Sequence, residues 1–94
     1  MTLQLSSEYE LHSISCISNG RIVFNKSTGR IFKLNESGYW ILSQFLAPAL
    51  SENVLILFKA RYKGDIEVME TDFWHIIDVY VSSGILCNPK DADS

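Results

Sequence analysis

The residues of this chain that could carry out catalysis are few and scattered. His12, His75, Cys16 and Cys87 are the only histidines and cysteines in the sequence. They show neither a Cys-x-x-Cys nor a His-x-x-x-His spacing, which would organise a metal site. A nucleophile would also need a base and an orienting partner within reach. We therefore expect a protein that is not an enzyme and binds no metal or cofactor, with His75 facing solvent.

A different kind of chemistry is suggested by the segment Arg30-Ile31-Phe32-Lys33-Leu34. Its β-branched and aromatic residues favour a strand, and no strong strand follows that would cover its edge. The unpaired N–H and C=O groups of such an edge can hold an extended peptide. Arg30 and Lys33 would attract acidic residues of that peptide, although an exposed ion pair contributes only about 0.2–1 kcal/mol.

The elements that position this segment form a three-stranded antiparallel sheet. Residues 11–17 alternate in polarity as a half-buried strand does. Asn19-Gly20 predicts a tight hairpin turn before a second strand at residues 22–24. Ser27-Thr28-Gly29 predicts a second turn before the third strand, at residues 31–34. The third strand is therefore expected at the edge of the sheet.

Three helices are expected after the sheet. The first is capped by Asn35 and ends at Pro48, and the second is capped by Ser51 and ends at Gly64. The third begins within residues 67–70 and ends at Gly84. One apolar stripe runs along it, made of Met69, Phe73, Ile76, Ile77 and Tyr80. This order predicts an α+β fold that is winged-helix-like.

The 94 residues are enough for one domain with one core. Residues 1–7 and 88–94 are expected to be frayed, and Ile85-Leu86 to dock back as a short extended segment. No apolar run reaches the roughly 20 residues of a membrane span, and the first residues do not resemble a signal peptide. We therefore expect a cytoplasmic protein that contacts no membrane, with Cys16 and Cys87 reduced and buried.

The net charge of −3 is unevenly distributed. Basic residues gather in the predicted hairpin, and acidic residues follow Gly64. The basic set is Arg21, Lys26, Arg30 and Lys33, and the acidic set is Asp65, Glu67, Glu70, Asp72 and Asp78. These charges either form ordinary solvated surface or face different parts of a partner. The acidic last helix argues against a winged helix that binds DNA, because contacts with phosphates need Lys or Arg.

Residues 20–86 resemble the PqqD-like family, also called RiPP recognition elements. The resemblance rests on Thr28-Gly29-Arg30 followed by Leu34-Asn35, on Tyr62 with Ile66, and on the pattern Asp72-Phe73, Ile76-Ile77, Tyr80, Gly84-Ile85-Leu86. Two features depart from the family: Tyr80 stands where a Leu is usual, and the loop at residues 47–50 lacks a Gly-rich connection.

The resemblance implies a non-catalytic module that binds the leader segment of a ribosomally made precursor peptide. The leader would add a strand to the edge formed by residues 30–34, in a groove walled by the last helix. On that helix the family motif favours the flank with Asp72, Ile76 and Val79, and the other flank, with Trp74 and Val81, is the alternative.

The partners implied are the leader and a processing enzyme. Small free-standing members of the family serve lasso-peptide pathways, with a separate leader peptidase, or act as peptide chaperones in pyrroloquinoline quinone biosynthesis. We favour the lasso type. A second copy of the chain could also pair through the open edge as a homodimer, and no nucleic-acid partner is expected.

Overall fold

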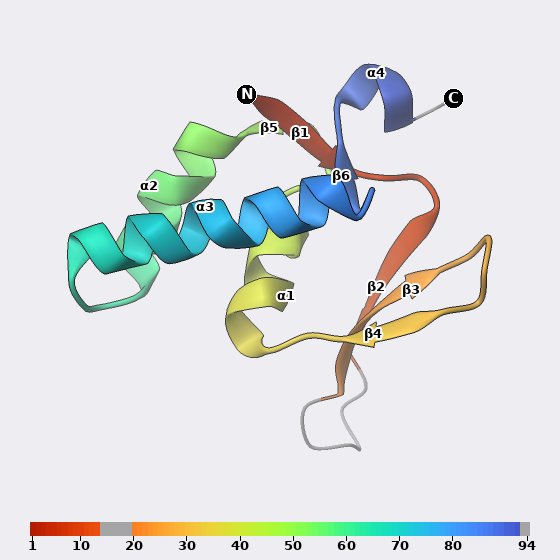
Figure 1. Cartoon of the computed structure of the whole chain (residues 1–94), viewed down its shortest axis with the longest axis horizontal. Helices are drawn as coiled ribbons and strands as arrows, with labels where there is room; N and C mark the ends of the chain where they lie inside the picture. The colour runs from red at the N-terminus through yellow and green to blue at the C-terminus, as the bar shows by residue number, and fades with distance from the viewer. Residues whose placement is uncertain (14–19, 93–94) are drawn as a thin grey trace.

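The computed structural model describes residues 1–13 and 20–92. It contains two small antiparallel sheets with helices packed against them (Figure 1). The first sheet has the order β2-β3-β4, with β2 at Tyr9–Ser13, β3 at Arg21–Asn25 and β4 at Ile31–Lys33. The second has the order β5-β1-β6, with β5 at Ala49–Leu50, β1 at Thr2–Leu5 and β6 at Leu86–Cys87.

The helices are α1 at Glu36–Ser43, α2 at Ser51–Arg61, α3 at Ile66–Ser82 and the short α4 at Pro89–Ala92. In Figure 1, α1 lies between the first sheet and α3, and α2 lies along the other half of α3. Within the described residues, no helix combines the length and the apolar composition needed to cross a membrane.

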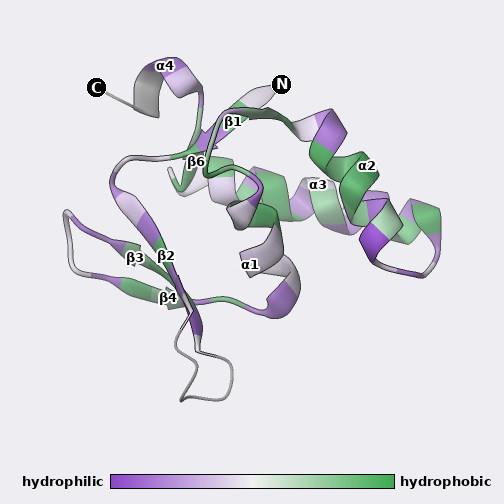
Figure 2. Cartoon of the chain, turned by 180° about the vertical axis from the view of Figure 1, so that it is seen from behind, coloured by the Kyte–Doolittle hydropathy of each residue, from purple (hydrophilic) through white to green (hydrophobic). Residues whose placement is uncertain are grey.

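The core lies where the helices meet the two sheets. Val23, Phe45 and Phe73 are fully buried, and Leu86 is buried to 1% exposure. Figure 2 shows apolar residues concentrated on α2 and α3. Phe58 of α2 and Phe73 of α3 contact each other with ring centroids 5.5 Å apart, and this contact fixes the two helices together.

The turn between β3 and β4 is built around Asn25, which is only 8% exposed. Its side-chain Oδ1 accepts hydrogen bonds from the N–H groups of Ser27 and Thr28, at 2.8 and 3.1 Å. The N–H of Gly29 donates to the Asn25 carbonyl, and Gly29 has a φ of 77°, a conformation that favours glycine. Asparagine is common in turns because it satisfies nearby backbone donors in this way, so β4 leaves the turn in a defined direction.

The expectation that residues 1–7 are frayed is wrong. Thr2–Leu5 form the central strand of the second sheet and pair with both β5 and β6. Leu3 and Leu5 are buried in the core at 3% and 9% exposure. At the other end, Leu86 docks back as expected, and α4 follows where fraying was expected. Residues 93 and 94 lie outside the described residues.

The strand expected at residues 11–17 is β2, which begins at Tyr9, two residues earlier than expected. The end of the expected strand lies among residues 14–19, outside the described part of the chain. The Asn19-Gly20 turn and Cys16 are likewise not covered. Cys87 is half-buried in β6 rather than fully buried.

The helix boundaries differ from the expected ones at several points. Helix α2 ends at Arg61 rather than at Gly64, and α3 begins at Ile66, just before the expected start within residues 67–70. Helix α1 ends at Ser43 rather than at Pro48, because the chain turns there and the carbonyl of Phe45 accepts a hydrogen bond from the N–H of Leu5. Ser51 is the first residue of α2 and not its cap; Leu50 holds that position without a side-chain bond. The Asn35 cap is confirmed, since its Oδ1 accepts from the Gly38 N–H at 2.7 Å.

Candidate functional site

A hollow of about 660 Å³ lies between β4 and the C-terminal end of α3. This volume is within the range of sites that bind small molecules or side chains. We refer to it as the hollow. It is lined by Tyr9, Val23, Asn25, Thr28, Arg30, Phe32, Lys33, Leu34, Asn35, Val79, Tyr80, Ser83 and Ile85.

The sheet wall of the hollow is formed by alternate residues of β4 and its flanks. Phe32 pairs directly with Val23 of β3, so both side chains lie on the same face of the sheet. Arg30 and Leu34, two residues away on either side, share that face. Leu34 is buried, whereas Phe32 is 41% exposed. An exposed aromatic ring beside a hollow is a surface that a ligand can cover.

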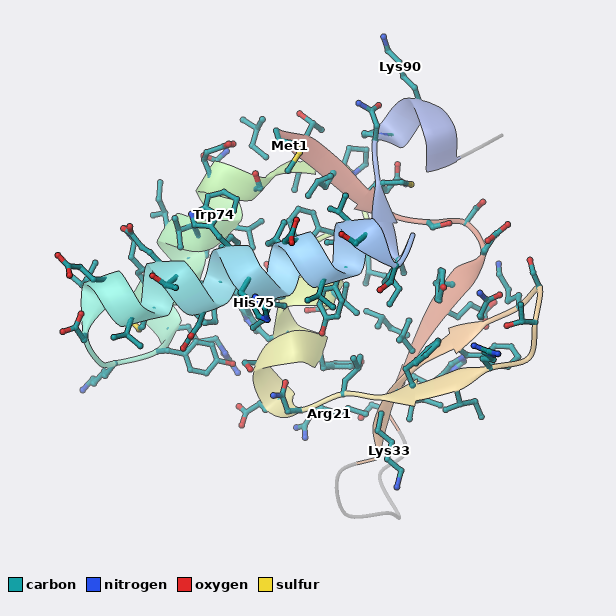
Figure 3. The ribbon with its side chains drawn as sticks, viewed as in Figure 1. Met1, Arg21, Lys33, Trp74, His75 and Lys90 are labelled. Atoms are coloured by element: carbon teal, nitrogen blue, oxygen red, sulfur yellow. The ribbon has the colours of Figure 1, made fainter. Side chains whose placement is uncertain are left out.

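Ile31 is the one residue of the predicted edge that does not line the hollow. Its side chain alternates to the outer face of the sheet, where it is 59% exposed. Lys33 belongs to the same outward set, although some of its atoms line the hollow. Figure 3 shows the Lys33 side chain pointing away from α3.

The backbone of β4 offers its hydrogen-bonding groups outward at Ile31 and Lys33. The Leu34 N–H donates to the Arg21 carbonyl, and the Asn25 N–H donates to the Arg30 carbonyl, both at 2.8 Å. These two bonds fix the phase of the antiparallel ladder, in which alternate residues bond to the partner strand. The N–H and C=O groups of residues 31 and 33 therefore point away from β3. In the described part of the chain, β4 is an edge strand, as the sequence predicts.

The helix wall is formed by the last turns of α3. Val79 and Tyr80 line the hollow, and so does Ser83 just beyond the helix. Val79 is 44% exposed and faces the hollow as Phe32 does from the sheet. Tyr80 is half-buried, and this burial raises the pKa of its hydroxyl above the ordinary value of 10.0.

Two residues predicted for this wall lie elsewhere. Asp72 borders a separate shallow depression with Glu67, Val68 and Thr71, and Ile76 is half-buried against the core. Both share the helical stripe that leads to Val79. At 1.5 Å per residue, Asp72 lies roughly 10 Å from Val79 along the helix axis, toward the N-terminus of α3. The hollow therefore covers only the C-terminal end of the predicted flank.

Trp74, on the alternative flank of α3, lies on the side of α2 and not beside the hollow (Figure 3). It stacks edge-on against Phe73, with ring centroids 5.1 Å apart. His75 is exposed on the surface of α3, as the sequence predicts.

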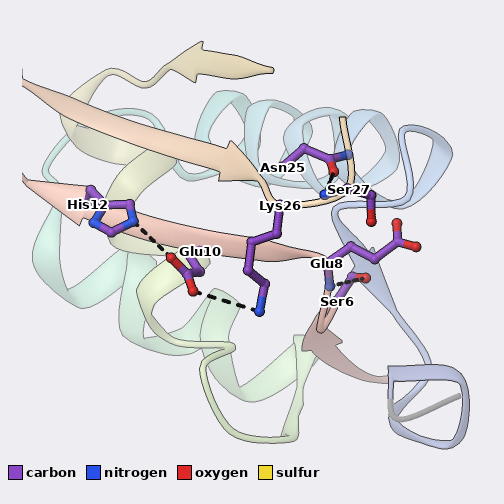
Figure 4. Close-up of polar contacts among 7 residues, drawn as sticks. All are labelled: Ser6, Glu8, Glu10, His12, Asn25, Lys26 and Ser27. Atoms are coloured by element: carbon purple, nitrogen blue, oxygen red, sulfur yellow. Dashed lines mark hydrogen bonds and ion pairs between the residues drawn. The ribbon is translucent and has the colours of Figure 1, made fainter. Parts of the chain in front are cut away.

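The four basic residues of the hairpin have different surroundings. Lys26 forms an ion pair with Glu10 at 3.7 Å, and Glu10 also contacts His12 at 3.1 Å on the outer face of the sheet (Figure 4). Arg21 lies over the ring of Tyr39, 6.0 Å from its centre.

Arg30 and Lys33 are the two cations that line the hollow. Within residues 1–13 and 20–92, neither forms an ion pair, and no acidic side chain is among the lining residues. The wall of the hollow is therefore positive.

Several lining residues were not predicted as site residues. Tyr9 and Ile85 come from distant parts of the chain and meet at the hollow only through the fold. Asn25 could have been anticipated, because an Asn directly before a turn commonly anchors it. Tyr80 was assigned to the apolar stripe, and it both packs against the core and lines the hollow.

Two solved structures share this arrangement of strands and helices. One is a lasso peptide synthetase B1 complexed with the leader peptide, with a TM-score of 0.73 and 15% sequence identity over 92% of this chain and 98% of that chain. The other is TbiB1 in complex with the TbiA(beta) leader peptide, with a TM-score of 0.72 and 19% identity over 88% of this chain and 93% of that chain.

The chain has the fold of these two proteins. The likeness extends over nearly the whole of each chain and confirms the α+β architecture predicted from the sequence. It also agrees, at the level of fold, with the resemblance carried by residues 20–86. No family model and no curated protein match the sequence.

Proposed function

We propose that this protein is a non-catalytic module that captures the leader segment of a ribosomally made precursor peptide by strand addition to β4. The observation that carries the proposal is the uncovered edge of β4 beside the hollow. Its outward groups at Ile31 and Lys33 can complete a ladder with an added strand, and the hollow takes alternate side chains of that strand. Both structural neighbours bear leader peptides in their complexes.

The lasso-peptide type is favoured over the pyrroloquinoline quinone type, because one of the two similar structures is a lasso peptide synthetase B1. In this role the module presents the bound leader to a separate processing enzyme, such as a leader peptidase. We expect it to act as one domain in the cytoplasm. Pairing of two copies through β4 would occupy the same edge and compete with the leader.

A DNA-binding winged helix is not favoured. Between Ile66 and Ser82, helix α3 contains neither Lys nor Arg. Its acidic residues Glu67, Asp72 and Asp78 are exposed, and they would be repelled by phosphates.

The proposal is tested with a displayed library of short random peptides selected against the protein. Ile31→Pro and Lys33→Pro each remove an N–H that points outward, and leave the bonds between β3 and β4 intact. We expect selected peptides to bind the wild type with micromolar or better affinity, about −8 kcal/mol at 1 µM. Binding should fall at least tenfold in both variants, with unfolding curves showing that the fold is retained.

Phe32→Pro serves as the matched structural control, because the ladder directs the Phe32 N–H to Val23 within the sheet and its loss should lower stability as well. If the library yields no peptide that prefers the wild type over Ile31→Pro and Lys33→Pro, strand addition to β4 is not the function.

A further inference from the structure

The pairing of β4 determines which of its side chains an added strand will meet. Arg30, Phe32 and Leu34 face the hollow, whereas Ile31 and Lys33 face the outer side of the sheet. In a strand added to the free edge, side chains directly across from one another lie on the same face. We refer to the peptide that forms this added strand as the guest peptide. Its residues opposite Phe32 and Arg30 therefore both point to the hollow and are separated by one residue.

These two positions on the guest meet different chemistry. The residue opposite Phe32 enters between two half-exposed apolar side chains, Phe32 and Val79. The residue opposite Arg30 meets a basic residue that lines the hollow and, within the described residues, forms no ion pair.

The position of Arg30 is fixed by its backbone. Its carbonyl accepts from the Asn25 N–H at 2.8 Å, and its N–H donates to Thr28 Oγ1 at 3.3 Å. Asn25 in turn is buried and anchors the turn. The guanidinium therefore starts from a rigid end of the hairpin, which favours a directed contact with a carboxylate over a diffuse attraction.

Resting on the proposed function, we infer that the guest peptide is recognised by an apolar residue and an acidic residue two positions apart. The apolar side chain covers Phe32 and Val79, and the carboxylate pairs with Arg30. The order along the guest follows from its direction. An antiparallel guest reads apolar-x-acidic, and a parallel guest reads acidic-x-apolar.

Lys33 is excluded from this role by the same alternation. Its side chain starts on the outer face of the sheet, so it contributes to the positive field at the edge but is not directed toward the hollow-side acid as Arg30 is. The structure thus separates two cations of equal charge that lie three residues apart, Arg30 directly before β4 and Lys33 at its end, and this pair provides a matched control.

The test uses the displayed random peptide library, selected in parallel against the wild type, Arg30→Glu and Lys33→Glu. Peptides enriched on the wild type should carry Asp or Glu two positions from a bulky apolar residue. Arg30→Glu should replace that acid by Lys or Arg, whereas Lys33→Glu should retain it. For one selected peptide, replacing its acidic residue by Lys should weaken binding to the wild type about tenfold. Arg30→Glu should restore the affinity for this Lys-containing peptide.

The outcomes separate the inference from the function on which it rests. Binders that depend on the β4 edge but carry no acid at this spacing would overturn the inference and leave strand addition standing. The same result follows if Lys33→Glu rather than Arg30→Glu restores the affinity for the Lys-containing peptide. If no peptide prefers the wild type over Ile31→Pro, the proposed function itself is overturned.

Discussion

The hydroxyl of Tyr80 occupies the space in which a side chain on residue 38 would begin. A Cβ built on Gly38 would lie 2.5 Å from Tyr80 Oη and 3.0 Å from Asn35 Oδ1. Gly38 is in the first turn of α1, and Tyr80 is near the end of α3. The absence of a side chain at residue 38 therefore allows α1 and α3 to approach each other at the inner end of the hollow.

Gly38→Ala should destabilise the protein, although alanine is the better helix former by roughly 0.5–1 kcal/mol. The new methyl group would overlap the Tyr80 hydroxyl, and overpacking of this kind costs about 1–3 kcal/mol. Urea unfolding measures the change.

The double variant Gly38→Ala/Tyr80→Phe provides the control. The next atom of Tyr80 lies 3.8 Å from the new Cβ, so removing the hydroxyl should recover part of the loss. Equal losses in the single and double variants would show that the contact with Tyr80 is not the cause.

Phe32→Asp should weaken binding of a selected peptide tenfold to a hundredfold, because it replaces an apolar wall of the hollow by a charge; burying a Phe contributes about 1.5–3 kcal/mol. Stability should change little, since Phe32 is already 41% exposed. Isothermal titration calorimetry gives the affinity.

Ile31→Asp introduces the same charge on the neighbouring residue, on the opposite face of the strand. It should reduce affinity far less than Phe32→Asp. Equal effects would mean that the added charge, and not the lost wall, weakens binding.

Val79→Gln and Trp74→Gln should have opposite effects on binding and stability. Val79 lines the hollow, so its replacement should lower peptide affinity about tenfold and leave the unfolding midpoint nearly unchanged. Trp74 packs edge-on against Phe73, and such pairs contribute about 0.5–1.5 kcal/mol. Its replacement should lower stability and spare affinity. The reverse pattern would place the groove on the α2 side of α3.

The stability of the protein should decline at alkaline pH partly through Tyr80. Burial raises the pKa of its hydroxyl above 10.0, so the unfolded chain releases this proton at a lower pH than the folded protein does. Stability is therefore unaffected well below pH 10, and falls as the pH rises from about 10 through the raised pKa.

Tyr80→Phe should lose this part of the alkaline decline. Urea unfolding of the wild type and of Tyr80→Phe from about pH 8 to about pH 11 gives the difference in unfolding free energy. The other tyrosines are present in both proteins, so their contribution cancels. If the unfolding free energies of the two proteins change in parallel over that range, the decline does not come from Tyr80.

The β4 edge could be predicted from the sequence because its signals are local. The turn Ser27-Thr28-Gly29, a short apolar strand and the Asn35 cap all lie within a few residues of one another. The hairpin, the exposed edge and the start of α1 follow from them. The same local chemistry predicts the α3 stripe, since apolar spacing on a helix does not depend on the rest of the fold.

The second sheet and the extent of the hollow could not be predicted in this way. Leu5 pairs with Leu86, more than eighty positions away, and a two-residue strand has no pattern that reveals its partner. Asp72 and Ile76 were placed beside Val79 because all three share one helical flank. How far β4 extends along that flank is decided by tertiary packing, which the periodicity of the helix does not encode.

The pairing of β1 with β6 has a consequence for synthesis on the ribosome. Strand β1 is made about eighty residues before β6, so one of its edges has no partner until Leu86 and Cys87 have emerged. The β2-β3-β4 hairpins need only neighbouring residues and are free to form much earlier. The nascent chain should therefore carry a nearly finished β4 edge while its other sheet is still open, and the apolar side chains of Leu3 and Leu5 would lack part of their packing during that interval.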